Sequence, residues 1–108
     1  MDYGCGKGFD ADFYGVDKYD PHFFPKKPRT KYDVVMCNYV LNVVPKKDIK
    51  TILASIKKLL KKDGAAYITV RRDIKKEGKT KIGTEQYNVN LNLKVIYKSS
   101  NFCIYTMK

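Results

Sequence analysis

A glycine-rich stretch at the start of the sequence, "DYGCGKG", has residue types and a spacing that could serve a ligand. Gly4, Gly6 and Gly8 alternate with other residues, although glycine loses more conformational freedom on folding than any other residue. The pattern is favoured where the chain needs a positive φ or where a ligand lies too close for a Cβ atom. Asp17 ends the next apolar run, "FYGVD", where a carboxylate could accept hydrogen bonds from ribose hydroxyls. These residues predict a site for a nucleoside-bearing ligand.

Two further stretches carry side chains suited to a second ligand. Asn38 and Tyr39 follow the apolar run "YDVVMC", and either could hold a substrate by hydrogen bonds. A polar loop from Arg71 to about Tyr87 follows the run "AAYITV", and its basic residues are expected to surround the ligand edge. The substrate-binding candidates in this loop are Arg71, Arg72, Lys75 and Lys79. His22 is the single histidine, and its proline-rich surroundings make it a weak candidate for a general base.

The elements that must position these residues alternate in type. Buried strands are predicted at 13–17, 32–37 and 65–70, and apolar residues at helical spacing predict a helix before the last of them that ends at Gly64. A closing hairpin is predicted from 94–98 and 102–107, whereas three prolines exclude a continuous element over 18–31. A strand, a helix and a strand in that order predict an α/β fold with a mostly parallel sheet. Ligands of such sheets bind at the carboxyl ends of the strands, where the candidate residues fall.

Composition limits the class of protein. We expect a single domain over 1–108, and 44% hydrophobic residues are typical of a globular chain. We find no signal-peptide pattern and no apolar run of about 20 residues, so a cytoplasmic protein is expected. The three cysteines have no metal-like spacing and are expected to be reduced and mostly buried. No metal site is therefore predicted.

The charge is strongly positive. Lysine and arginine number 22 against 11 acidic residues, which gives a net charge of +11. This balance favours contact with a polyanion such as nucleic acid. Only three of the basic residues are arginines, so a general compositional drift toward lysine explains the charge equally well.

Several of these segments together resemble class I S-adenosylmethionine-dependent methyltransferases. "DYGCGKG" resembles their first motif and "YGVD" their second, ribose-binding motif, while "YDVVMCNYVLNVV" and "LLKKDGAAYITV" are similar to the segments of their fourth and fifth strands. The resemblance covers nearly all of the chain and implies a Rossmann-like fold. It also implies that the cofactor S-adenosylmethionine is bound by Asp2, Gly4, Cys5, Gly6, Gly8, Asp17, Asn38 and Tyr39.

The chain also departs from that family. Only Met1 precedes Asp2, so most of the first strand is expected to be missing, and the first helix and third strand are expected to be reduced or absent. The adenine contact is unassigned, with Tyr19, Asp20 and Phe23 as candidates by position. Dinucleotide-binding enzymes fit less well, because their G-x-G-x-x-G spacing is absent. The short spacings are also loosely similar to methyltransferases associated with DNA phosphorothioation.

These observations favour a methyltransferase that uses S-adenosylmethionine. The methyl acceptor is open, with nucleic acid favoured by the charge. The alternative is a degenerate domain of the same fold that binds nucleic acid or a partner protein without catalysis. The shortened elements favour this alternative, and the retained glycines and Asp17 favour the enzyme.

Overall fold

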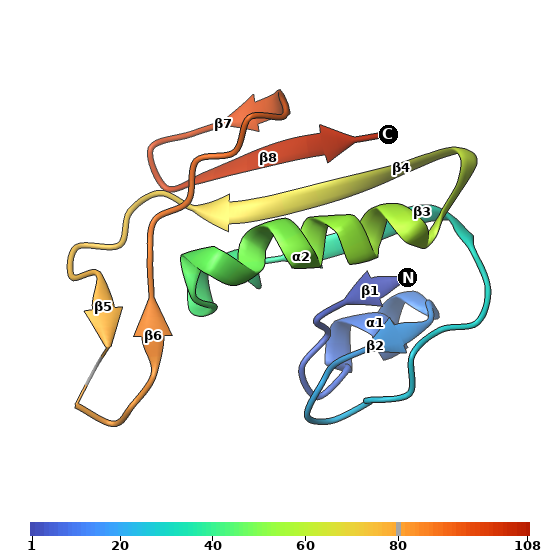
Figure 1. The fold of residues 1–108 in the computed structure, drawn as a ribbon, viewed down its shortest axis with the longest axis horizontal. Helices are drawn as coiled ribbons and strands as arrows, with labels where there is room; N and C mark the ends of the chain where they lie inside the picture. The colour runs from blue at the N-terminus through green and yellow to red at the C-terminus, as the bar shows by residue number, and fades with distance from the viewer. Residues whose placement is uncertain (80) are drawn as a thin grey trace.

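The computed structural model describes residues 1–79 and 81–108, and its main feature is a six-stranded mixed sheet (Figure 1). In spatial order the strands are β2 (Lys18–Tyr19), β1 (Asp2–Tyr3), β3 (Tyr32–Asn38), β4 (Leu60–Arg71), β8 (Phe102–Met107) and β7 (Lys94–Lys98). The first four strands are mutually parallel, and β8 and β7 are antiparallel to their neighbours. This arrangement confirms the predicted Rossmann-like α/β fold with a C-terminal antiparallel hairpin.

One helix covers one face of the sheet. The helix α2 (Lys46–Lys58) follows the short 3-10 helix η1 (Leu41–Val43) and lies along β3 and β4 (Figure 1). Its apolar stripe buries Ile56 completely in a core that also contains Val35 and Ile68. These two strand residues alternate with outward-facing neighbours, as a half-covered sheet requires.

The other face of the sheet is largely uncovered among the described residues. The helix α1 (Phe9–Tyr14) is short, and Phe13 on it is 82% exposed. Val34 on β3 and Tyr67 on β4 are also exposed. Tyr97 and Phe102 stack with ring centroids 5.3 Å apart on the hairpin strands.

The predicted strand at 13–17 is wrong. Phe13 and Tyr14 form the last turn of α1, and Gly15 ends this helix with a left-handed φ of 66°. The chain then needs Val16 and Asp17 to reach the sheet, so the paired strand β2 begins only at Lys18. As a result Asp17 lies before the strand, and Asp20 lies at its carboxyl end.

The predicted helix end at Gly64 is also wrong. The helix α2 ends at Lys58, and Leu60 already pairs with Tyr32 as the first residue of β4. Gly64 is needed for another reason, because a Cβ atom there would lie 2.8 Å from the Tyr32 carbonyl oxygen. Two adjacent strands therefore approach too closely for a side chain at this position.

The other predicted strands are present in the structure. The strand predicted at 65–70 lies within β4, which begins at Leu60. The strand predicted at 32–37 is β3 with one further residue, and the hairpin strands at 94–98 and 102–107 are β7 and β8. The predicted polar loop contains a small hairpin of β5 (Gly78–Lys79) and β6 (Glu85–Gln86), which extends away from the sheet (Figure 1). Among the described residues, no helix is long and apolar enough to cross a membrane.

Candidate functional site

A cavity of about 490 Å³ lies at the carboxyl ends of β1, β3 and β4. The glycine loop forms one wall, the end of β3 forms another, and Thr69 of β4 borders the space between them. Six of the eight predicted cofactor residues line this cavity, namely Asp2, Gly4, Cys5, Gly6, Asn38 and Tyr39. The fold therefore brings together residues that are 36 positions apart in sequence.

The three glycines of the loop all have a positive φ, but their surroundings differ. A Cβ atom at Gly4 would lie 2.3 Å from Cγ2 of Val40, so this glycine is required by packing. A Cβ atom at Gly8 would meet the side chains of Lys18 and Phe24 at 3.0 and 3.1 Å. Gly8 is buried and does not line the cavity. At Gly6 a Cβ atom would meet nothing within 4 Å, and this position borders the cavity. Gly6 is thus the glycine whose bare backbone is open to a ligand.

Asp20 holds the glycine loop in place. Its Oδ2 atom accepts a hydrogen bond of 2.9 Å from the Gly6 backbone N–H, and its Oδ1 atom accepts bonds from the N–H groups of His22 and Phe23. Burial acts to raise the pKa of Asp20, but these three backbone donors outweigh it and hold the pKa below its usual value. The carboxylate is therefore charged at neutral pH and links β2 to the loop.

Asp17, by contrast, does not reach the cavity. It borders a different cavity together with Lys26 and Tyr32, and its Oδ2 atom accepts a hydrogen bond of 2.7 Å from the Tyr32 hydroxyl. Burial and this bond to Asp17 together raise the pKa of Tyr32 to about 12. The expected position of Asp17 beside the glycine loop is therefore wrong, because β2 begins later than predicted.

Two acidic residues border the cavity near the loop. Asp2 on β1 is buried, and burial followed by the charge of Asp10 raises its pKa above the usual value. Asp10, in the first turn of α1, is exposed and was not singled out from the sequence. Among the residues that the structure describes, no lysine or arginine lines the cavity, although the chain carries 22 of them. The cavity is thus suited to a ligand that carries positive charge.

The end of β3 is locally strained. Tyr39 has a φ of 63°, the one non-glycine residue with a positive φ among the described residues. Its backbone N–H donates a hydrogen bond of 2.8 Å to the Thr69 carbonyl, while the residue as a whole is 46% exposed. A strained backbone of this kind persists only where surrounding contacts compensate for its cost. Such residues are concentrated at functional sites.

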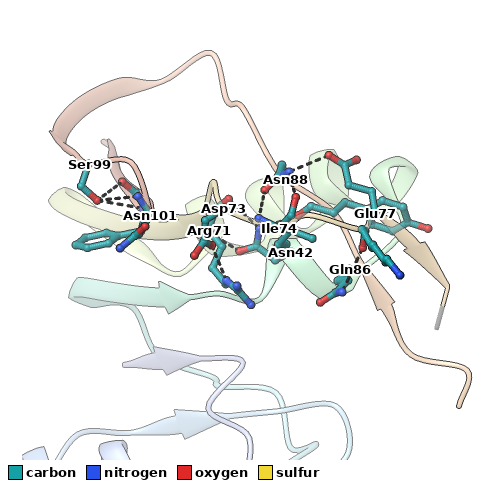
Figure 2. A network of polar contacts seen from close by, with 12 residues as sticks. Asn42, Arg71, Asp73, Ile74, Glu77, Gln86, Asn88, Ser99 and Asn101 are labelled. Atoms are coloured by element: carbon teal, nitrogen blue, oxygen red, sulfur yellow. Dashed lines mark hydrogen bonds and ion pairs between the residues drawn. The ribbon is translucent and has the colours of Figure 1, made fainter. Parts of the chain in front are cut away.

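A buried asparagine that the sequence did not single out links the end of β4 to the residue that follows β6. Asn42 of η1 donates hydrogen bonds of 3.2 and 2.8 Å to the carbonyl oxygens of Arg71 and Tyr87, and it accepts one of 2.8 Å from the Arg71 N–H. Asn88 makes a similar pair with both backbone groups of Ile74 (Figure 2). An asparagine inside the apolar run "VLNVV" was the available signal, because a buried amide must find partners.

Of the four predicted substrate-binding residues, the two arginines have partners within the protein and the two lysines are exposed. The Arg71 guanidinium pairs with Asp73 at 2.9 Å (Figure 2). Arg72 donates a hydrogen bond to the Ser99 carbonyl of the hairpin. Lys75 and Lys79 are exposed. None of these four residues lines the cavity, so their predicted role would require a substrate that extends beyond it.

Comparison with known proteins gives the family. The sequence pattern described as "Methyltransferase domain" matches residues 1–82. Among solved structures, "DhpI-SAH complex structure" has a TM-score of 0.64 at 13% identity and covers 97% of this chain and 73% of that chain. "DhpI-SAM-HEP complex" has a TM-score of 0.64 at 12% identity, with 97% and 75% covered. These likenesses show the fold, and no curated protein sequence matches. The family pattern covers most of the chain, which therefore belongs to the methyltransferase domain family.

Proposed function

We propose that this protein is a methyltransferase that binds S-adenosylmethionine in the 490 Å³ cavity. The observation that carries the proposal is Gly6, whose bare backbone faces open space at the cavity wall while Asp20 fixes its N–H. Family membership supports the same cofactor, and the two similar structures are complexes of DhpI with SAH and with SAM. The cofactor supplies a methyl group on a positively charged sulfonium.

The residues of the cavity fit such a ligand. S-adenosylmethionine carries an ammonium and a sulfonium, and the lining offers the carboxylates of Asp2 and Asp10 without any cationic side chain. Asp20 replaces Asp17 as the candidate for the ribose contact, because its carboxylate bonds the N–H of Gly6 at the cavity wall. Asp20 itself is buried behind the loop and is not a lining residue, so this contact requires the ribose to reach past Gly6. Three backbone donors leave lone pairs on its two oxygens, since an ionised carboxylate offers about four acceptor positions.

The protein's own contribution to methyl transfer is mainly alignment. Displacement at a methyl group gains its rate when the nucleophile is held in line and close to the carbon. The strained end of β3 fixes Asn38 and Tyr39 at the cavity, where an amide and a phenol can orient an acceptor by hydrogen bonds. No separate base is needed when the acceptor is already a good nucleophile.

We further propose nucleic acid as the acceptor. The net charge of +11, the exposed lysines of the loop after β4 and the loose likeness to phosphorothioation-associated methyltransferases support it. Because Arg71 and Arg72 have partners within the protein, phosphate contact falls to the lysines of that loop. Changing Lys75, Lys76 and Lys79 together to glutamine should lower the salt slope of binding to a DNA oligonucleotide by about 2 to 3 units. The same change at Lys47, Lys50 and Lys57 on α2 is the control, and equal slopes would point to a small-molecule or protein acceptor.

The alternative, a binding domain without catalysis, is favoured by the short α1 and the exposed aromatic residues on the uncovered sheet face. Calorimetric titration with S-adenosylhomocysteine, with NAD as the control, tests cofactor binding first. Binding of S-adenosylhomocysteine but not NAD supports the proposal. A chain that binds neither compound would favour the binding domain.

A further inference from the structure

A second cavity, of about 270 Å³, lies on the α2 side of the sheet. It is enclosed by the ends of β1 and β2, the last turns of α2 and the loop around Pro28. It shares no lining residue with the cavity at the glycine loop. The methyl transfer proposed above gives this second cavity no role.

Two tyrosines form one wall of this cavity. The rings of Tyr3 and Tyr19 have centroids 5.0 Å apart at an interplanar angle of 41°. Leu59 and Pro28 add apolar surface on the other sides. These four side chains give the cavity an apolar wall, against which a flat aromatic group can pack in an offset or edge-to-face contact.

Tyr19 also offers an unused hydroxyl. The residue is only 9% exposed, and its hydroxyl makes no hydrogen bond with any residue in the described part of the chain. Within that part, no fully buried side-chain oxygen or nitrogen lacks a partner, so the Tyr19 hydroxyl must reach open space. Tyr19 is one of the residues that line this cavity. A polar group from a ligand is the partner that such a hydroxyl lacks.

Two lysines border the same cavity. Lys58 comes from the last turn of α2 and Lys27 from the loop, and neither takes part in an ion pair between residues that the structure describes. The lining contains no acidic residue. Lys27 also borders the neighbouring cavity that contains Asp17, so Lys58 is the clearer cation of the two. An anionic group on the ligand would therefore lie near the lysines.

We propose that this cavity binds a small aromatic phosphate, with its ring against Tyr3 and Tyr19 and its phosphate between Lys27 and Lys58. The Tyr19 hydroxyl donates a hydrogen bond to a phosphate oxygen. Each half of the ligand alone would use only part of the cavity. An aromatic ring without charge leaves the lysines unused, and inorganic phosphate leaves the tyrosine wall uncovered.

Phenyl phosphate is the probe for this site, titrated into the full chain and followed by NMR shifts of the tyrosine rings. A dissociation constant on the order of millimolar is expected for so small a ligand. Inorganic phosphate and benzyl alcohol should each bind at least fivefold more weakly. The titration is repeated with saturating S-adenosylhomocysteine, which should leave the affinity unchanged. Loss of binding under that condition would place the probe in the glycine-loop cavity and overturn the proposal.

Substitutions assign the site. Lys58→Gln should weaken binding about threefold to fivefold, and Tyr19→Phe about fivefold, the scale of one ion pair and one hydrogen bond. Lys57→Gln is the matched control, because Lys57 is the preceding exposed lysine of α2 and does not line the cavity. Equal effects at Lys57 and Lys58, or the absence of any shift of the tyrosine rings, would refute the site. Should Tyr19→Phe fail to fold, the comparison of the two lysine variants decides.

Discussion

Replacing Asn42 by leucine should destabilise the protein strongly, although the two side chains have similar sizes. Asn42 is only 2% exposed and makes three hydrogen bonds to backbone groups of Arg71 and Tyr87. The variant loses all three and leaves their backbone partners without the amide, at about 1 kcal/mol for each bond. We therefore expect a loss of about 3 kcal/mol, a large part of the roughly 5 to 15 kcal/mol that stabilise a typical domain.

Urea denaturation measures this loss. With an m-value of about 1 to 3 kcal/mol per molar urea, the midpoint should fall by about 1 to 3 M while the slope stays constant. Asn92→Leu is the control, because Asn92 is exposed and makes no hydrogen bond that the structure describes. It should change the midpoint very little. If Asn42→Leu lowers the free energy of unfolding by less than about 1 kcal/mol, the hydrogen bonds between Asn42 of η1 and Arg71 of β4 do not stabilise the fold.

Three further predictions concern the glycine loop and its surroundings. Gly4→Ala should lower the free energy of unfolding by about 2 kcal/mol or more, because its Cβ atom would overlap with Val40. Gly6→Ala should lower it by only about 1 kcal/mol, the cost of a left-handed backbone for a residue with a side chain. Urea denaturation measures both losses. Asp20→Ala should cost about 2 kcal/mol at pH 7 and Asp17→Ala much less. Because the folded pKa of Asp20 is lowered, its contribution to stability is present above the unfolded value near 3.9 and is lost as the pH falls through the folded pKa. The stability of Asp20→Ala should therefore approach that of the wild type in acid. Cys5 borders the cavity and is partly exposed, whereas Cys37 and Cys103 are buried, so a thiol reagent should label Cys5 first. Bound S-adenosylhomocysteine should slow this labelling. Equal labelling rates with and without the ligand would contradict the site.

The parts of the fold that the sequence predicted well are those with strong local patterns. The run at 32–37 is apolar and β-branched, and the two hairpin strands flank a short polar turn, so each forms a strand whatever lies around it. The glycine loop was predicted for the same reason. Its alternating glycines have few uses other than a positive φ or a close approach, and Gly4 and Gly6 line the cavity.

The parts that were missed depend on contacts between distant residues. Leu59 and Leu60 continue the helical spacing of α2, but pairing with Tyr32 draws Leu60 into β4. The strand β2 has only two paired residues, so its register is fixed by β1 and not by its own sequence. Because β2 begins at Lys18, Asp20 and not Asp17 lies at the carboxyl end of the strand. A local pattern could not distinguish them, because each acid directly follows a residue that is common in strands, Val16 before Asp17 and Tyr19 before Asp20.

S-adenosylmethionine is proposed to lie against Gly6, and titration calorimetry with S-adenosylhomocysteine can test this placement. Gly6→Leu and Gly15→Leu form a matched pair, because both glycines have a left-handed φ, of 58° and 66°, and at both a Cβ atom would meet nothing within 4 Å. Only Gly6 borders the cavity. The wild type and Gly15→Leu should bind with equal affinity, while Gly6→Leu should bind at least tenfold more weakly with its fold retained. Equal affinity in the two variants, or no binding by the wild type, would contradict the claim.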